Sequence, residues 1–160
     1  MENGYFDELN KYMNEIMFAI ITSPNLPKLL TYKDVSVYSR ETPSNPFELL
    51  YKNVYPYGYK PDIQTEVDSY ITIEFDDFRP TKGNQFMYGY IVISVFSHES
   101  IQKTNYGNRL LLLYDEVHKI MNNRDIGVGT LKLKTGRIIT SLKKPYSGHY
   151  LVYEIVDFNK

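Results

Sequence analysis

Residues 86–97 read FMYGYIVISVFS, and this segment decides the fold of the chain. Side chains alternate between the two faces of a sheet in an extended strand, so Ile91, Ile93 and Val95 share one face. Their neighbours Val92 and Phe96 are also apolar, although they point the other way. A strand with two apolar faces is typical of the centre of a sheet that is covered on both sides, by its own chain or by a partner subunit.

The sequence on either side of this segment predicts further antiparallel strands. Residues 70–78, YITIEFDDF, alternate apolar and polar side chains, and the turn-forming residues that follow join them to the central segment as a hairpin. Residues 131–142 predict a second hairpin, which turns at the Thr-Gly pair 135–136. Residues 149–158 predict the last strand.

Two amphipathic helices accompany these strands. Residues 5–21 place apolar side chains at helical spacing and end before Ser23-Pro24, and residues 25–30 can add a short helical turn. Residues 105–122 repeat the helical pattern. We therefore expect an α+β fold, in which an antiparallel β-sheet is packed by an N-terminal helix and one long helix.

The segment from about 35 to 68 is rich in tyrosine and proline and reads as a long irregular excursion. Residues 35–38 predict a short strand within it, and residues 47–51 predict a helical turn. Two interpretations are open for the excursion: an arm that docks on a neighbouring subunit, or a loop that its aromatic residues pack against its own body.

Length and composition indicate one globular domain over residues 1–160. The chain is 42% hydrophobic and has no cysteine, which excludes disulfides, thiol catalysis and cysteine-bound metals. It begins without a basic signal-peptide segment, and no apolar run is long enough to span a bilayer. The 16 tyrosines fit surfaces that become buried on assembly, although a genome poor in G and C explains them equally well.

The charges are unevenly distributed along the chain. Residues 1–80 carry 13 acidic and 7 basic side chains, whereas residues 81–160 carry 6 acidic and 11 basic ones. A dipolar chain can complement its own copies head to tail, the contact that closes rings. The alternative is that both halves fold into one body in which the charges intermix.

Few residues indicate chemistry. Glu74, Asp76 and Asp77 form a tight acidic cluster that could hold a hard cation, but charged strand ends commonly serve solubility. The three histidines have no metal-ligand spacing, and Gly127-Val128-Gly129 lacks the rest of a dinucleotide fingerprint. We therefore expect no enzyme, no catalytic residue, no cofactor and no metal site.

The chain resembles the tail-terminator, or tail-completion, proteins of long-tailed bacteriophages. The resemblance rests on patterns of hydrophobicity and element order over most of the chain, in residues 22–30 (TSPNLPKLL), 90–97 (YIVISVFS), 106–110 (YGNRL), 117–122 (VHKIMN) and 150–158 (YLVYEIVDF). Residues 35–68 depart from it, because the family usually reaches its first core strand sooner.

The resemblance implies a virion structural protein of the phage neck, assembled in the host cytoplasm. Its copies would form a ring, a hexamer, that caps the tail tube, stops its polymerisation and provides the surface for joining the head. The implied partners are other copies, the tail tube protein and a head-completion or connector protein, while DNA passes through the ring without specific recognition. A head-closure or connector ring is the alternative within the neck.

Other classes of function have weaker support in the sequence. A nucleic-acid-binding module could use the basic residues between 132 and 144, and a small hydrolase could use the acidic cluster with a histidine. If the ring forms, aromatic and basic residues are the natural subunit contacts. The candidate subunit or partner contacts are Tyr55, Tyr57, Tyr59, Phe78, Arg79, Lys132 and Lys134.

Overall fold

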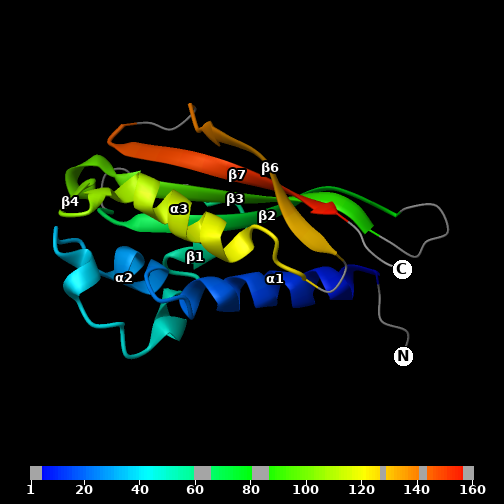
Figure 1. Cartoon of the computed structure of the whole chain (residues 1–160), viewed down its shortest axis with the longest axis horizontal. Helices are drawn as coiled ribbons and strands as arrows, with labels where there is room; N and C mark the ends of the chain where they lie inside the picture. Colours follow the sequence, from blue (N-terminus) through cyan, green and yellow to red (C-terminus); the bar gives the residue numbers. More distant parts are fainter. Residues whose placement is uncertain (1–4, 60–65, 81–86, 127–128, 141–143, 157–160) are drawn as a thin grey trace.

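A five-stranded sheet with helices packed on one of its faces forms the body of the molecule (Figure 1). The structure is a computed structural model that describes residues 5–59, 66–80, 87–126, 129–140 and 144–156. In chain order its elements are α1 (Tyr5–Ile21), α2 (Leu26–Thr31), η1 (Val37–Ser39), η2 (Pro46–Leu49), β1 (Val54–Tyr55), β2 (Ser69–Pro80), β3 (Met87–His98), η3 (Glu99–Ile101), β4 (Lys103–Thr104), β5 (Gly107–Asn108), α3 (Arg109–Met121), β6 (Thr130–Ile138) and β7 (Tyr146–Val156).

The strand order β1-β2-β3-β7-β6 confirms that β3 is central. β3 pairs antiparallel with β2 and β7, β6 pairs antiparallel with β7, and the two-residue β1 adds a parallel pair at the β2 edge. The α+β class expected from the sequence is confirmed, and β1 makes the sheet mixed.

One face of the sheet packs against the helices and forms the core. Ile71, Ile91 and Ile93 on this inner face are fully buried, as are Ile16 of α1 and Leu113 of α3. Burying an aliphatic side chain of this size contributes about 1.5–3 kcal/mol, so this layer supplies most of the stability.

Arg109 joins the helical layer to the excursion. Its side chain is fully buried at the start of α3, and its guanidinium donates to four backbone carbonyls. The acceptors, at 2.8–3.1 Å, are the oxygens of Ile101, Leu29, Tyr32 and Asp34. Burial lowers the pKa of Arg109. Two of the acceptors lie at the end of α2, where the helix leaves carbonyls without partners.

Three local predictions from the sequence are wrong. Residues 35–38 form no strand, because Ser39 bonds back to the carbonyl of Ser36 through both its amide and its hydroxyl, at 3.0 and 2.7 Å. The long helix begins at Arg109 instead of residue 105. The side chain of Asn108 caps it, accepting from the amide of Leu111 at 3.3 Å, and the hairpin β4–β5 precedes it.

The predicted hairpin at residues 131–142 is the third error. β6 continues through Thr135 and Gly136 as one strand, and it pairs with β7 on both sides of a bulge at Lys134. The phenol of Tyr114 occupies the place of a side chain at Gly136, where an added Cβ would lie 1.6 Å from its oxygen. This glycine marks a close approach between helix α3 and the sheet, not a turn.

Candidate interaction surface

The face of the sheet turned away from the helices, called the outer face below, carries the side chains that alternate with the core. From β2 across β3 and β7 to β6, its rows are Tyr70–Phe96–Gly148, Thr72–Ser94–Tyr150–Arg137, Glu74–Val92–Val152–Thr135 and Asp76–Tyr90–Glu154–Lys132. The first row carries two aromatic side chains. The last two rows begin with an acidic residue on β2 and have apolar or aromatic residues in the middle, and in the last row Glu154 on β7 lies beside Lys132 on β6. The outer face therefore has two different ends.

Tyrosines cover the end of the outer face that contains Tyr70. The ring of Tyr59 stacks on that of Tyr55, with centroids 4.1 Å apart, and both rings lie against Tyr70. The hydroxyls of Tyr59 and Tyr70 donate to the carboxylate of Glu66 at 2.9 and 2.8 Å. The Tyr146 hydroxyl donates to the backbone oxygen of Glu66 at 2.6 Å. Burial first, and then the bond to Glu66, raises the pKa of Tyr59 and Tyr70.

This tyrosine cluster (Tyr55, Tyr59, Tyr70 and Tyr146) bears on the two interpretations of the excursion. The described part of the excursion packs against the body of its own chain, as expected if it is a loop held by its aromatic residues. Tyr55 is only 8% exposed and Tyr59 is half-buried, so both use most of their surface within the chain. Tyr57 is 48% exposed and keeps surface for a partner.

The other end of the outer face is partly exposed in the described part of the structure. Tyr90, Val92 and Val152 are half-buried along its middle. Exposed carboxylates of Glu74 and Asp76 lie on β2 at one side. We call this pair the acidic margin. The candidate contacts Phe78 and Arg79 continue β2, and their side chains lie outside the described part of the structure.

Exposed basic side chains lie on β6 at the opposite side of the outer face. Lys132, Lys134 and Arg137 form what we call the basic margin. A β-bulge between Leu133 and Thr135 makes Lys134 an extra residue, and its ammonium reaches over the sheet to the Tyr90 hydroxyl at 2.9 Å. This hydrogen bond raises the pKa of Lys134.

Neutral oxygens accept the hydrogen bonds of both lysine ammonium groups. Lys132 donates to the side-chain oxygen of Asn123, and Lys134 donates to the phenol of Tyr90, over whose ring it also lies. A neutral partner positions a charge without cancelling it. Glu154 on β7 lies opposite Lys132 in the strand pairing and adds, after the Tyr90 bond, to the raised pKa of Lys134, so it offsets one of the three positive charges. The basic margin keeps a net positive charge, and the acidic margin lies across the sheet from it.

Comparison with known protein families identifies the family of this chain. The model of the YomW family matches residues 23–155, which include the described sheet except Val156, the last residue of β7. The chain belongs to the YomW family. The family name is of the kind given to prophage proteins, which indicates a phage-related protein. No curated protein matches the chain.

Other candidate sites in this YomW-family chain are weaker. No group of three or more His, Cys, Asp or Glu residues in the described ranges is arranged to hold a metal ion. Each histidine has a different partner: His98 bonds to Ser100, His118 to the Tyr153 hydroxyl at 3.1 Å, and His149 meets the edge of Tyr114. None of the described helices has the length and apolar character needed to cross a bilayer.

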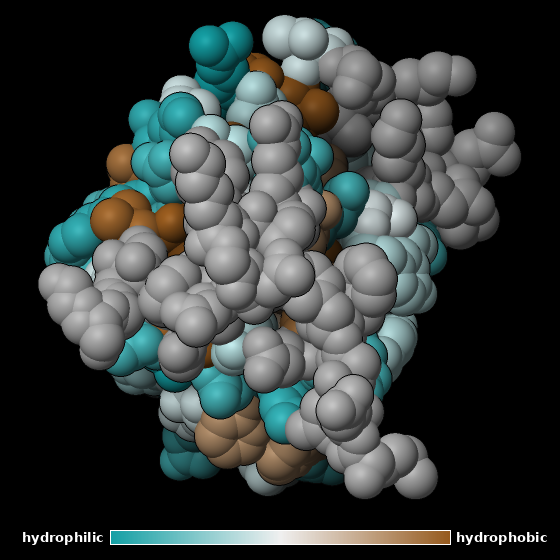
Figure 2. All heavy atoms as spheres, turned by 90° about the vertical axis from the view of Figure 1, so that its right-hand side faces the viewer, coloured by the Kyte–Doolittle hydropathy of each residue, from teal (hydrophilic) through white to brown (hydrophobic). Residues whose placement is uncertain are grey.

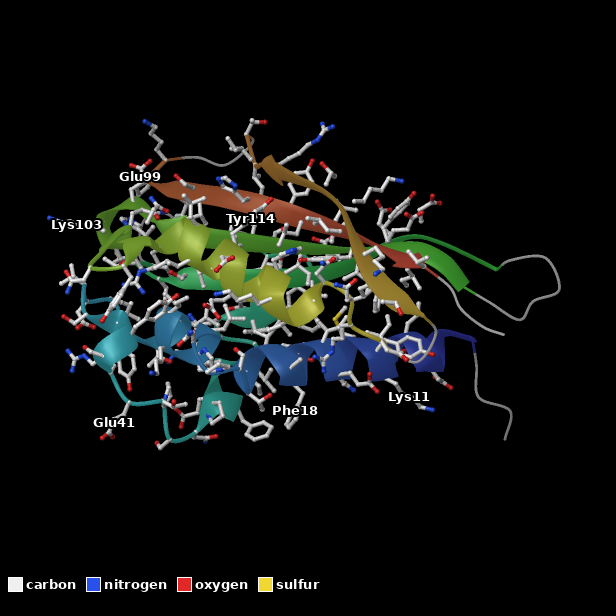
Figure 3. All side chains as sticks on the ribbon, in the orientation of Figure 1. Lys11, Phe18, Glu41, Glu99, Lys103 and Tyr114 are labelled. Atoms are coloured by element: carbon white, nitrogen blue, oxygen red, sulfur yellow. The ribbon has the colours of Figure 1, made fainter. Side chains whose placement is uncertain are left out.

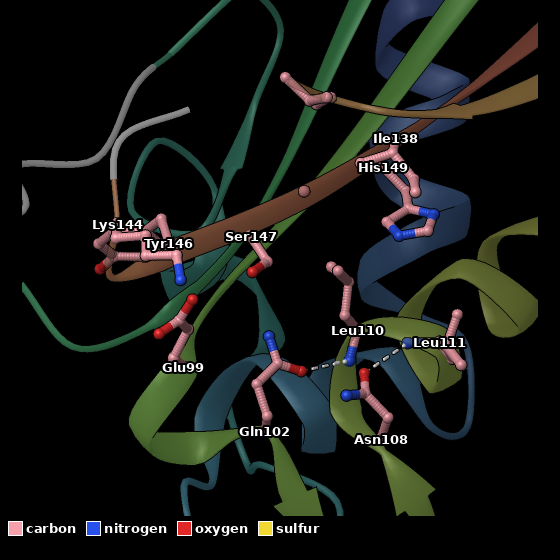
Figure 4. Close-up of a pocket in the computed structure, with 12 residues that line it drawn as sticks. Glu99, Gln102, Asn108, Leu110, Leu111, Ile138, Lys144, Tyr146, Ser147 and His149 are labelled. Carbon is pink, nitrogen blue, oxygen red and sulfur yellow. Dashed lines mark hydrogen bonds between the residues drawn. The ribbon is translucent and has the colours of Figure 1, made fainter. Parts of the chain in front are cut away.

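A groove of about 570 Å³ lies beside the start of α3, between this helix and the strands β6 and β7 (Figure 4). Leu111 and Ile138 on its rim are 55% and 66% exposed. The amides of Leu110 and Leu111 are already bonded to the side chains of Gln102 and Asn108. Sequence reasoning missed this groove, because one wall comes from residues 99–111 and the other from residues 138–149, which are distant from the first in the chain.

Exposed aromatic side chains also lie on the helical side of the molecule. Phe18 on α1 points away from the sheet and meets Phe47 of η2, with ring centroids 6.2 Å apart (Figure 3). At the end of the molecule where α1 begins and β7 ends, hydrophilic residues separate small apolar groups in the described part (Figure 2). Neither region matches the outer face in combining exposed apolar surface with opposed charges.

Proposed function

We propose that this chain is a virion structural protein of the phage neck, a tail terminator whose copies form a ring on the end of the tail tube. The ring stops polymerisation of the tube and offers its free side to the head-completion or connector protein. In this proposal the chain has no turnover and no cofactor, and DNA passes through the ring without being read.

The observation that carries the proposal is the outer face of the sheet. In the described part of the structure one end of it is partly exposed, its middle carries Tyr90, Val92 and Val152 together with Glu154, and its two sides carry opposite charges. A surface of this kind suits contact between neighbouring proteins, since aromatic residues are enriched in interface cores and opposite charges set register. Membership of a phage-type family supports a role in a virion.

The direct test is polymerisation of the cognate tail tube protein with and without this chain. We expect the chain to shorten the tubes and to form a ring at one end, visible by negative-stain electron microscopy. A variant with the control changes Lys33→Glu and Lys103→Glu, at exposed lysines outside the outer face, should cap equally well. Tubes of unchanged length with bare ends would overturn the proposal.

The same sample separates the terminator from the alternative neck ring. A head-closure protein would leave the tube ends bare and would bind the connector of the isolated head. Binding to a labelled DNA strand that falls steeply with salt would instead favour the nucleic-acid-binding reading of the basic margin. Either result contradicts tube capping as the role of the chain.

A further inference from the structure

The acidic and basic margins cannot neutralise each other within one chain. β3 and β7 lie between β2 and β6, so three strand spacings, roughly 14 Å, separate the two margins. This separation exceeds the screening length of about 10 Å at moderate salt. Glu154 on β7 offsets one charge of the basic margin, and the two positive charges that remain, like the acidic margin, are available to an opposite charge on another molecule.

We propose that the neighbour is a second copy of this chain and that the acidic margin of one copy meets the basic margin of the next. The inference rests on the proposed function, which requires copies to associate, and it names the surfaces that they use. Glu74 and Asp76 supply one side of the contact, and Lys132, Lys134 and Arg137 supply the other.

Strand direction permits this contact without turning a copy over. β2 and β6 are antiparallel to each other, because each of the three pairings between them is antiparallel. β1 pairs with β2 only at Ile71 and Thr72, so moving one copy sideways along the sheet places the part of β2 beyond that pairing, which carries the acidic margin, beside the β6 of its neighbour in antiparallel orientation. The contact is head to tail, so a small rotation at each step closes a ring.

The contact is made by side chains and not by a continuous hydrogen-bond ladder. The loop after α3 already occupies the start of the β6 edge: the Leu131 amide donates to the Arg124 oxygen at 2.8 Å, and the Leu133 amide donates to the Asn122 side chain. A bulge interrupts β2 at Asp77, whose φ is +50°. Bulges and charges on edge strands prevent uncontrolled strand pairing.

Aligned face-to-face dimers satisfy the surface less well. A two-fold axis parallel to the strands would put acidic over basic margins, but it would also stack the two tyrosine-covered ends on each other. A two-fold axis across the strands would separate the covered ends, but it would oppose like charges. The head-to-tail contact avoids both conflicts.

Charge reversal on each margin tests the inference. One variant carries Lys132→Glu and Lys134→Glu, and the other carries Glu74→Lys and Asp76→Lys. Molar mass is measured by light scattering at low salt, from micromolar to millimolar protein. We expect the unaltered chain to form multimers that dissociate with salt, and each variant alone to associate at least about 100-fold more weakly.

Mixing gives the sharpest result. An equimolar mixture of the two variants opposes an intact margin to an intact margin and a reversed margin to a reversed margin, so it should recover multimers. The matched controls are Lys33→Glu/Lys103→Glu and Glu41→Lys/Glu48→Lys, at exposed residues outside the outer face (Figure 3 labels Glu41 and Lys103). Thermal unfolding of every variant establishes that it is folded.

The outcomes are distinct. Multimers of either margin variant alone, no recovery in the mixture, or an unaltered chain that stays monomeric at millimolar concentration would overturn the inference. If tubes are still capped by the margin variants, the terminator proposal stands and these margins are not the contact. If the margins join copies but tube ends stay bare, the contact stands and the terminator proposal fails.

Discussion

The two faces of the same sheet differ in how completely the described chain covers them. The inner face carries fully buried isoleucines that its own helices cover. Among the described residues, tyrosines cover one end of the outer face, and the other end presents half-buried apolar residues between acidic and basic margins. The inner face is complete within one chain, whereas the outer face retains surface for another molecule.

The largest loss of stability is expected on the helical side, at Arg109. Arg109→Ala removes donors from four buried or part-buried carbonyls and should lower the free energy of unfolding by about 3–5 kcal/mol. Urea unfolding followed by circular dichroism measures this change. Arg40→Ala removes an exposed pair with Asp34 and should cost less than about 1 kcal/mol. Equal effects of the two variants would contradict the role of Arg109.

Adjacent residues of β3 compare the two faces directly. Ile93→Ala should cost about 2–4 kcal/mol, because the inner-face side chain is fully buried. Val92→Ala on the outer face should cost less than about 1.5 kcal/mol and should weaken association of copies more than Ile93→Ala does. Unfolding and light scattering on both variants provide the comparison. A larger stability loss for Val92→Ala than for Ile93→Ala would contradict the assignment of the core to the inner face.

Gly136 tests the close approach between α3 and β6. Gly136→Ala forces the Tyr114 phenol aside and should cost about 1–3 kcal/mol. Tyr114→Phe removes the oxygen that lies nearest the added methyl group, so the double variant should recover part of the loss. If the costs of the two substitutions simply add, the two residues do not meet as the structure has them.

Alkaline pH should weaken the tyrosine cluster before it affects the inner face. Folding raises the pKa values of Tyr55, Tyr59, Tyr70 and Tyr146, so the stability gained from their neutral forms is present below about pH 10 and lost as the pH rises above it. Unfolding temperatures between pH 8 and about pH 11.5 measure the loss, and Tyr59→Phe should reduce it. An unfolding temperature that stays constant over this pH range would contradict the contribution of the buried, neutral tyrosines to stability.

Periodicity in the sequence predicted the helices and the central strand, because each pattern extends over three or more turns or alternations. It failed where a distant contact decides the local conformation. Gly136 reads as a turn residue, but Tyr114 makes it a close-approach residue. Arg109 reads as one cation on a helix, and its four acceptors come from segments up to 80 residues away. The alternation of β3 likewise could not reveal which face the helices cover.

Part of the candidate surface was predictable and part was not. Lys132 and Lys134 were recognised from their alternation with leucines, and the dipolar charge of the chain is evident from counting. The pairing of strands places the acidic and basic groups on opposite edges of one face, and no local pattern specifies it. The involvement of Tyr57, Phe78 and Arg79 in contacts remains a prediction.

Cross-linking through introduced cysteines tests the head-to-tail contact most directly, because the chain contains no cysteine. Asp76→Cys and Lys132→Cys lie at opposite edges of the sheet, beyond disulfide distance within one chain. With a short flexible bismaleimide, the double variant should give a covalent series that extends beyond dimers, and each single variant should stay uncoupled. Dimers from the single variants, or no series from the double variant, would contradict the account.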